Sequence, residues 1–239
     1  MENKFERSIQ ALGEAAFERL QAAKVIIFGV GGVGGWCAEA LLRTGVQQLT
    51  LVDFDQVNPS NINRQIVATA ANIGQPKVTE MQKRLLSINP DAQITALPLR
   101  YNEETADQFD LDQYDYIIDA IDSVADKALL LTRAAASKAT VFASMGAGRK
   151  VDTTQIRVSR FSKVEGCPLA RALRQRLKKM SIVHTFRSLS EGDKNCQLST
   201  ITCVWSPELK STTGTIAPVV GVFGMTLADL VIKDILTKC

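Results

Sequence analysis

Four closely spaced glycines and a later aspartate are the residues of this chain whose types and spacing most directly suggest chemistry. Glycine has no Cβ atom, so a glycine turn lets the backbone lie against a phosphate or a ribose. The N-terminus of a following helix adds a favourable dipole for negative charge. A carboxylate at the end of the next apolar run can hydrogen-bond ribose hydroxyls. The pattern predicts a nucleotide-binding turn of Gly29, Gly31, Gly32 and Gly34, with Asp53 beside it.

The segment after Asp53 distinguishes two kinds of nucleotide site. The glycine spacing alone also fits an NAD-binding protein, in which backbone amides neutralise a pyrophosphate. Here a polar loop contributes Asn61 and Arg64, and Lys77 lies in the first turn of the next expected helix, where a cation indicates a nearby anion. Asp122 follows a later strand, and a carboxylate there can hold magnesium against a triphosphate. These groups favour ATP, attacked at its α-phosphorus with loss of pyrophosphate.

Alternating strands and helices must position these side chains. Apolar runs predict strands over residues 25–28, 49–52, 93–99, 114–120 and 140–144. Helical patterns cover residues 5–22, 36–43 and 125–137, and a further helix starts near Gln75 and Pro76. We therefore expect an α/β fold with a doubly wound, mostly parallel, Rossmann-like sheet, preceded by a helical arm.

The pattern changes after residue 150. We expect residues 1–150 to form the ATP-binding core with its arm, and residues 151–239 to be a C-terminal extension of the same domain. The extension is predicted to hold a strand at 156–161, a basic helix at 168–180, a loop at 181–197, a strand-prone stretch at 198–205 and an apolar tail at 216–235. Pro218, Gly221, Gly224 and Asp229 interrupt the tail, which favours a buried or dimer-packing helix over a membrane span.

Charge is unevenly distributed along the chain. The 239 residues are 46% hydrophobic, enough for one substantial core, and the formal net charge is only +3. Between Arg157 and Arg187, however, nine lysines or arginines accompany a single acid, Glu165. Such a run is either a solvated helix face or a phosphate-binding surface for nucleic acid.

The ordered motifs resemble the ubiquitin-activating-enzyme-like adenylyltransferase superfamily, which includes the molybdopterin-synthase and thiamine-pathway adenylyltransferases. The resemblance covers most of residues 4–150. It is carried by Gly29-x-Gly31-Gly32-x-Gly34, Asp53-x-Asp55, Ser60-Asn61-x-Asn63-Arg64-Gln65, Gly74-x-x-Lys77 and Asp119-Ala120-Ile121-Asp122.

That resemblance implies a role for each matching residue. Asp53 would hold the ribose, Asp122 would hold magnesium, and Arg7 would reach the ATP site of the other subunit in a homodimer. The phosphates would be held by Asn61, Arg64 and Lys77, and Asp55 and Gln65 would belong to the same nucleotide site.

The second half resembles one branch of this superfamily, the tRNA threonylcarbamoyladenosine dehydratases. The similarity is carried by Asp119-Ala120-Ile121-Asp122-Ser123, Gly146-Ala147-Gly148, Asp152-x-x-Gln155-Ile156, the basic stretch 169–179 and Cys203-Val204-Trp205-Ser206-x-Glu208. It implies that ATP activates the threonine carboxylate of a modified adenosine beside the tRNA anticodon, which then closes into a ring. The basic stretch would then bind tRNA. Lys4-Phe5 departs from the family, which often has arginine before the aromatic residue.

Two other functions stay open at this stage. One is adenylation of the C-terminus of a ubiquitin-like sulfur carrier protein. Activators of that kind generally carry two zinc-binding cysteine pairs, and this chain has no Cys-x-x-Cys, so we expect no structural zinc. The other is a non-catalytic NAD-binding module, against which Arg64, Lys77 and Asp122 argue.

The five cysteines are scattered, and the N-terminus is polar and charged, so we expect a reduced, cytoplasmic protein without a disulfide framework. Cys203 matches the family's cysteine position. It is either an acceptor of sulfur or of an acyl group, with a sulfur-transfer protein as a further partner, or an inert packing residue. Whether Cys203 or the nearby Cys196 is reactive stays open, and His184 is expected to be exposed rather than catalytic.

Overall fold

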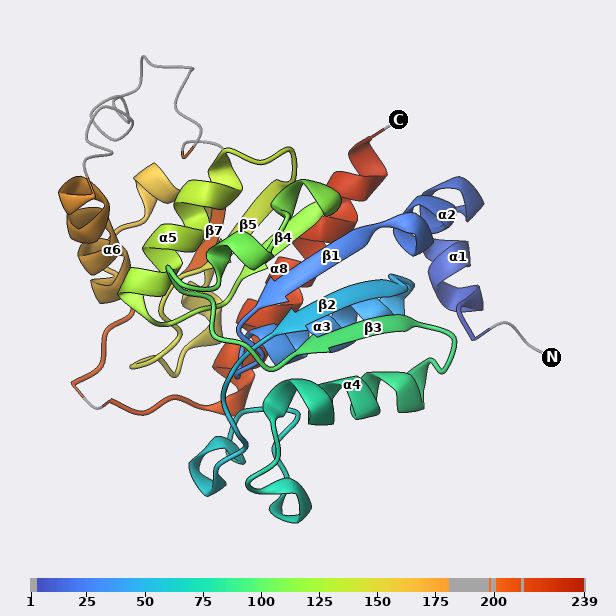
Figure 1. The fold of residues 1–239 in the computed structure, drawn as a ribbon, viewed down its shortest axis with the longest axis horizontal. Helices are drawn as coiled ribbons and strands as arrows, with labels where there is room; N and C mark the ends of the chain where they lie inside the picture. The colour runs from blue at the N-terminus through green and yellow to red at the C-terminus, as the bar shows by residue number, and fades with distance from the viewer. Residues whose placement is uncertain (1–3, 181–197, 199–200, 212, 239) are drawn as a thin grey trace.

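A single seven-stranded sheet organises the computed structural model, which describes residues 4–180, 198, 201–211 and 213–238. The strands are β1 (Lys24–Phe28), β2 (Gln48–Val52), β3 (Gln93–Leu97), β4 (Tyr116–Asp119), β5 (Thr140–Ser144), β6 (Arg157–Arg160) and β7 (Thr202–Trp205). Their order is β3-β2-β1-β4-β5-β7-β6, and only β6 runs antiparallel to its neighbour. The chain therefore starts at the centre of the sheet and winds first to one edge and then to the other (Figure 1). This is the predicted doubly wound α/β fold.

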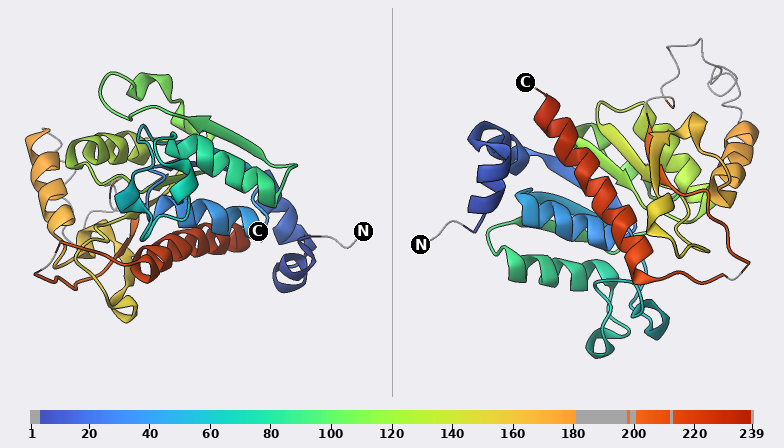
Figure 2. Two further views of the ribbon diagram at one scale, coloured as in Figure 1. Left: turned by 90° about the horizontal axis from the view of Figure 1, so that it is seen from below. Right: turned by 180° about the vertical axis from the view of Figure 1, so that it is seen from behind.

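Helices cover both faces of the sheet (Figures 1 and 2). The helices of one face are α3 (Gly34–Thr44), α4 (Lys77–Ile88) and α8 (Ala217–Thr237), and those of the other are α5 (Val124–Ala135) and α6 (Pro168–Lys179). Successive residues of β1 belong to opposite layers: Val25 and Ile27 pack into the α3 and α8 core, and Ile26 and Phe28 into the α5 side. This alternation follows from the two-residue period of a strand, and it explains why the central strands are apolar throughout.

The N-terminal arm is two helices, not the single helical segment predicted. Helix α1 (Glu6–Leu12) ends and α2 (Glu14–Ala22) begins at Gly13, whose φ of 83° lies in the left-handed region that glycine adopts readily. Both helices lie beside the amino end of β1 (Figure 1).

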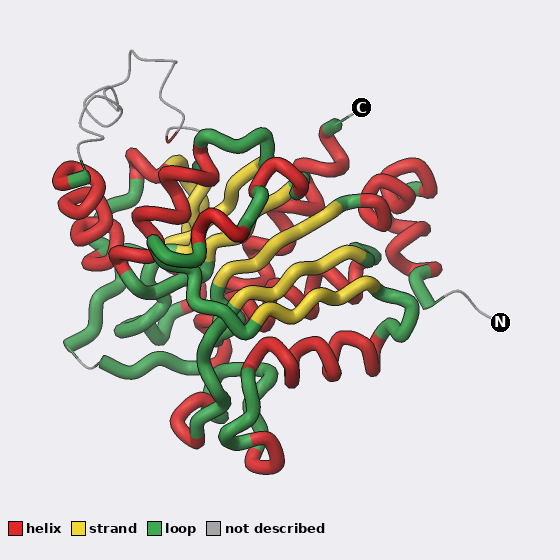
Figure 3. Tube along the Cα trace, viewed as in Figure 1, coloured by secondary structure: helices red, strands yellow, loops and turns green. Residues whose placement is uncertain are grey.

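Strand β3 ends two residues earlier than predicted, at Leu97. Pro98 follows, and proline has no backbone N–H with which to continue the ladder. The polypeptide then enters one of the long loops that gather at the carboxyl ends of the strands (Figure 3).

The C-terminal residues complete the same sheet. Strand β7 lies parallel to β5 with Cys203 opposite Ala143, and α8 packs closely against α3. A Cβ atom at Gly224 of α8 would lie 2.5 Å from the Val33 carbonyl oxygen, so the close crossing requires glycine there. In the part of the chain that the structure describes, no helix has the length and apolar character needed to span a membrane. The predicted loop at 181–197 lies outside the described residues.

Candidate nucleotide site

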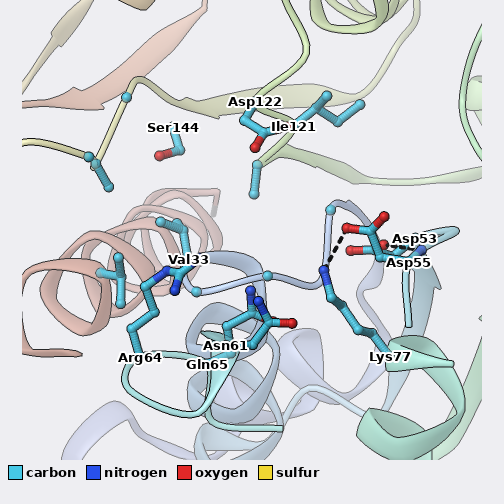
Figure 4. A pocket seen from close by; sticks show the side chains of 18 of the residues that line it. Val33, Asp53, Asp55, Asn61, Arg64, Gln65, Lys77, Ile121, Asp122 and Ser144 are labelled. Atoms are coloured by element: carbon cyan, nitrogen blue, oxygen red, sulfur yellow. Dashed lines mark hydrogen bonds and ion pairs between the residues drawn. The ribbon is translucent and has the colours of Figure 1, made fainter. Parts of the chain in front are cut away.

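A cavity of about 800 Å³ opens at the carboxyl ends of the strands, where ligands of doubly wound sheets bind. Asp122 and Ser144 lie on one side of it, and Asn61, Gln65 and Arg64 lie on the other (Figure 4). Most of the residues predicted for the site line this cavity: Gly29, Gly31, Gly32, Asp53, Asp55, Asn61, Arg64, Gln65, Lys77 and Asp122. Residues separated by more than sixty positions along the chain therefore meet at one edge of the sheet.

Two glycines of the turn are required by close backbone contacts. Gly29 has φ 89°, and a Cβ atom there would lie 2.7 Å from the Ala120 carbonyl oxygen. Gly34 opens α3, and a Cβ atom there would lie 1.8 Å from the Gly29 carbonyl oxygen. Gly34 does not line the cavity itself. It allows the turn to fold tightly, so that Gly31 and Gly32 present backbone to the ligand space.

Asp53 is fixed by backbone donors. Its two carboxylate oxygens accept hydrogen bonds from the N–H groups of Val30, at 2.7 Å, and of Asp55, at 2.9 Å. Burial raises the pKa of this carboxyl above its ordinary value, although the positive charge of Lys77 and the two N–H donors act in the opposite direction. The carboxylate is thus held at the end of β2, in the position expected of a ribose ligand.

Lys77 is a buried cation at the start of α4. Its Nζ lies 2.6 Å from Asp55 Oδ2, and its backbone N–H donates to the Asp55 carbonyl oxygen. The Lys77 side chain is 6% exposed and the Asp55 side chain 48%. In the structure, the anion beside Lys77 is Asp55.

The opposite wall carries an arginine and a buried amide. Arg64 Nη1 donates to the Ser60 carbonyl oxygen at 2.8 Å and to Asn63 Oδ1 at 2.9 Å, which aligns the guanidinium along the loop. Asn61 Oδ1 accepts from the Asn58 N–H, so this side chain also shapes the turn that precedes Arg64. Gln65 is 6% exposed, and its buried Oε1 has no hydrogen-bond partner among the described residues.

A buried ion pair that the sequence analysis missed supports the turn of Asp122. Lys127 Nζ lies 2.8 Å from Asp119 Oδ2, and both side chains are fully buried. Lys127 also donates to the Ile121 carbonyl oxygen, and Asp119 Oδ1 accepts from the Ile121 N–H. Burial raises the pKa of Asp119, and the Lys127 charge counteracts it. Asp122 itself is exposed at the cavity wall.

Donors for a divalent cation are few in the cavity. Within the described residues, no group of three or more His, Cys, Asp or Glu side chains could together hold a metal ion. Magnesium, however, commonly binds through one or two carboxylates and the phosphates of its nucleotide, so a single exposed Asp122 fits that ion when ATP is present.

Other residues of the wall could not be predicted from the nucleotide motifs. Arg100 Nε lies 2.9 Å from Asp126 Oδ2, and the guanidinium lies 5.4 Å from the ring centroid of the exposed Phe54. Tyr101 is buried, and its hydroxyl has no hydrogen-bond partner in the described structure. Burial raises the pKa of Tyr101 to about 12. Only their position after β3, at the carboxyl edge of the sheet, could have indicated Arg100 and Tyr101.

Two residues predicted to be catalytic lie outside the cavity. Arg7 is on α1, beside the amino end of the sheet, and its Nη1 is 3.5 Å from Gln10 Oε1. Cys203 is fully buried in β7, and burial raises the pKa of its thiol to about 12, which disfavours the thiolate that a nucleophile needs. Cys196 and His184 lie outside the described residues.

Fold and cavity together define a nucleotide-binding protein of the doubly wound α/β class. In the cavity, the glycine turn lies near Asp53, which is placed to bind a ribose, and near Arg64 and Lys77, whose positive charges suit phosphates. The model of the ThiF family matches residues 5–239, and the chain belongs to that family.

Similar proteins are found among curated sequences. The tRNA threonylcarbamoyladenosine dehydratase of Bacillus subtilis is 40% identical over 182 residues, which cover 76% of this chain and 72% of that protein. The dehydratase of Escherichia coli is 39% identical over 175 residues, covering 73% of this chain and 65% of that protein. A sulfur carrier protein adenylyltransferase from Thermus thermophilus is 36% identical over a shorter stretch, 126 residues or 50% of this chain.

The structural similarity covers nearly the whole chain. A crystal structure of E. coli tRNA N6-threonylcarbamoyladenosine dehydratase in complex with AMP superposes with a TM-score of 0.90 at 34% identity, covering 98% of this chain and 95% of that one. The same E. coli enzyme in complex with ATP gives a TM-score of 0.88 with matching coverage of this chain.

Proposed function

We propose that this protein uses ATP to dehydrate threonylcarbamoyladenosine beside the tRNA anticodon, through adenylation of the threonine carboxylate. The observation that carries the proposal is the cavity. One of its walls carries the predicted ATP ligands, including Asp53, Arg64 and Lys77, and it faces a second wall that the nucleotide motifs do not account for. That second wall consists of residues 144–148, 213–215, Leu169 and Val220. The E. coli dehydratase, whose structures with AMP and ATP superpose on 98% of this chain, supports the same activity.

Each reaction step has residues suited to it. Asp53 orients the ribose, and the glycine turn with the N-terminus of α3 receives phosphate oxygens. A carboxylate oxygen of the substrate attacks the α-phosphorus, the bond between the α-phosphorus and the bridging oxygen breaks, and pyrophosphate leaves. Arg64 and Lys77 supply positive charge where negative charge develops. This step requires Lys77 to move its contact from Asp55 to the phosphates.

The second step closes the ring. A nucleophilic atom of the same threonylcarbamoyl group attacks the activated carbonyl carbon and loses its proton. The bond from that carbon to the phosphate oxygen breaks, and AMP leaves with the oxygen of the original carboxylate. Relative to its protonated acid, the modified nucleoside has thereby lost one water: the oxygen leaves in AMP, and the proton of the nucleophile is released to solvent. In the preceding adenylation step, Asp122 would hold magnesium against the phosphates, and the ion would supply positive charge there.

The same proposal includes the tRNA-binding surface, the subunit organisation and the domain boundaries. The basic helix α6 binds the tRNA backbone, the protein acts as a cytoplasmic homodimer, and Arg7 serves the partner's site. Residues 1–150 form the catalytic core, and residues 151–239 extend the same domain. Burial of Cys203 gives no support to a sulfur-transfer partner.

Adenylation of a sulfur carrier protein is the second candidate, and the shorter match to an adenylyltransferase supports it. The absence of cysteine pairs in the sequence and the positive charge of residues 157–187 favour the tRNA reaction. One experiment separates the two functions. The protein is incubated with ATP and magnesium together with tRNA that carries or lacks threonylcarbamoyladenosine, and the nucleosides are analysed by mass. We expect loss of one water from the modified nucleoside only. An unchanged nucleoside, together with adenylation of an added carrier protein, would establish the second candidate instead.

A further inference from the structure

The cavity wall formed by residues 144–148 and 213–215 is supported, on the side away from the cavity, by hydrogen bonds of Lys150 and Glu208. Lys150 is 1% exposed, and its Nζ donates to the carbonyl oxygens of Ser206, at 2.9 Å, and of Glu208, at 2.6 Å. In return, Glu208 Oε2 accepts from the N–H groups of Val151 and Asp152, both at 2.9 Å. Residues 150–152 and 206–208 are thus joined by four hydrogen bonds, which we call the Lys150–Glu208 clasp.

Both members of the clasp are buried more deeply than surface charges normally are. Glu208 is 8% exposed, and the N–H donors of Asp152 and Val151 lower the pKa of its carboxyl. Its second oxygen, Oε1, accepts no hydrogen bond from the residues that the structure describes and lies 3.7 Å from Lys210 Nζ. Burying two charged groups is unfavourable unless they are well satisfied, and here both bond mainly to backbone. The clasp therefore serves to fix backbone segments.

The segments that it fixes form the cavity wall. Arg149, with φ 63°, donates its backbone N–H to the Gly214 carbonyl oxygen at 2.8 Å, and its own carbonyl oxygen accepts from the Lys210 N–H at 2.9 Å. Lys150 forms a parallel bridge with Thr215. Thr215 Oγ1 then donates to the Ala147 carbonyl oxygen at 2.9 Å, which joins the two wall segments on the cavity side.

The wall segment at Thr215 is in turn connected to Arg64, on the other side of the cavity, through Asn63. Asn63 Nδ2 donates to the Thr215 carbonyl oxygen at 3.1 Å, and Asn63 Oδ1 accepts from Arg64 Nη1 at 2.9 Å. A continuous series of contacts therefore leads from Glu208 through residues 149–152 and Thr215 to Asn63 and Arg64. None of these steps passes through Asp53 or Lys77, which hold the other side of the cavity.

We infer that Glu208 is a positioning residue for the adenylation step, which it serves by holding Thr215 and Asn63 so that Arg64 faces the reacting phosphate. The inference rests on the proposed function, since it assigns Arg64 to that phosphate. A small displacement of a reacting group costs roughly a hundredfold in rate, so the effect is large enough to measure. Asp53 and Lys77 keep their contacts, so the loss falls on kcat rather than on the KM for ATP.

The test compares Glu208→Ala with Glu208→Gln. Because one oxygen accepts both N–H groups, glutamine can keep both bonds, whereas alanine loses them. We expect Glu208→Ala to lower kcat with threonylcarbamoyladenosine-containing tRNA by roughly ten- to a hundredfold, with the KM for ATP changed by less than about threefold. Glu208→Gln should recover most of the activity, and the exposed Glu103→Ala is the matched control.

A double-mutant cycle separates positioning from general destabilisation. If Glu208 acts through Asn63, the losses in kcat from Glu208→Ala and Asn63→Ala should not add, because each breaks the same series of contacts. Additive losses, or a Glu208→Gln variant as impaired as Glu208→Ala, would overturn the inference.

Amide hydrogen exchange supplies a readout that needs no turnover. Glu208→Ala should accelerate exchange at residues 145–152 and 213–215, while residues of β1 and β2 keep wild-type protection. Unchanged exchange at both wall segments would also overturn the inference. If the wild-type protein failed to dehydrate the tRNA, the proposed function would be wrong, and the exchange comparison would still decide whether Glu208 holds the wall.

Discussion

Asp122 differs from Asp53 and Asp55 in that its exposed carboxylate forms no hydrogen bond or ion pair with the described residues. Asp53 and Asp55 already accept from backbone or lysine, whereas Asp122 sits above the buried Asp119–Lys127 pair. That pair fixes the turn without using the Asp122 carboxylate. We therefore propose Asp122 as the side chain that would bind magnesium together with ATP phosphates.

Asp122→Ala should reduce kcat far more than tRNA affinity, because it removes a ligand that stabilises charge in the transition state. The expected loss is several kcal/mol, or about two orders of magnitude or more in rate. Steady-state rates over a range of magnesium concentrations and tRNA binding by filter retention measure the two effects. Asp229→Ala, which removes an exposed carboxylate of α8, is the control. A wild-type rate at saturating magnesium would remove Asp122 from the metal site.

Cys203→Ala should leave turnover close to that of the wild type. The thiol is fully buried in β7, does not line the cavity, and has its pKa raised to about 12 by burial, so it is poorly suited to attack at neutral pH. The substitution is expected to lower the free energy of unfolding by roughly 1 kcal/mol through lost packing. Turnover and the thermal unfolding midpoint are the measurements. Loss of turnover in a variant of wild-type stability would restore Cys203 as a reactive residue.

At the scale of elements, the basic helix α6 contains two kinds of cation. Arg171, Lys178 and Lys179 are exposed. Arg174 instead donates to the Phe161 and Val164 carbonyl oxygens and lies 5.1 Å from the Phe161 ring centroid. The charge run is therefore partly structural, which the sequence could not indicate. A test of tRNA binding should leave Arg174 in place.

Replacing Arg171, Lys178 and Lys179 by glutamine should weaken tRNA binding and flatten its salt dependence. Each phosphate contact releases counterions, so the slope of log K against log salt should fall by up to about three units. ATP affinity should be unchanged, because none of the three lines the nucleotide cavity. The matched control replaces the exposed Lys83 and Lys233. If tRNA affinity equals that of the wild type at every salt concentration, this face of α6 is only solvated.

A contact between helices α3 and α4 makes the free energy of unfolding depend on pH. Glu39 of α3 is 5% exposed and receives hydrogen bonds from Arg43 of α3 and Arg84 of α4. Burial alone would raise the pKa of this carboxyl, but Arg84 and Arg43 outweigh it, and the net shift is downward. A lowered folded-state pKa means stabilisation that is present above the unfolded-state value and lost as pH falls through the folded-state value.

Glu39→Gln should therefore lower the free energy of unfolding at neutral pH by about 1–2 kcal/mol, discounted for the partial exposure of both arginines. The difference from the wild type should shrink as the pH falls through the lowered folded-state pKa, where the wild-type carboxylate is itself protonated. Urea unfolding at several pH values measures it. A difference that stays constant down to acidic pH would show that Glu39 acts through packing rather than charge.

The extent to which the sequence predicts this structure depends on the range of each contact. The strands, the glycine turn and the residues after β2 are encoded locally, so their periodicity and spacing were sufficient. The break at Gly13 was missed because helical spacing continues across it. The Asp119–Lys127 pair and the Lys150–Glu208 clasp depend on burial, and the clasp joins residues 56 to 58 positions apart, so a single sequence carries no signal for either.

At the scale of the whole molecule, the arm and the cavity lie at opposite ends of the strands. Helices α1 and α2 lie beside the amino end of β1, and the cavity opens at the carboxyl ends (Figure 1). A strand of five residues spans roughly 17 Å, so the Arg7 side chain on α1 cannot reach the cavity of its own subunit. If Arg7 contributes to adenylation, it must do so in a second copy of the chain.

Arg7→Ala and Asp122→Ala should each be nearly inactive as homodimers, but a mixed dimer should recover activity. In the heterodimer one site carries both defects, and the other receives Arg7 from one subunit and Asp122 from the other, which restores the charge that stabilises the phosphates. The two variants are co-expressed with different tags, the heterodimer is isolated by two affinity steps, and its turnover is compared with that of each parent. Recovery towards half of the wild-type activity supports a shared site. A heterodimer as inactive as its parents, with dimerisation verified by mass, would exclude Arg7 from the partner's reaction.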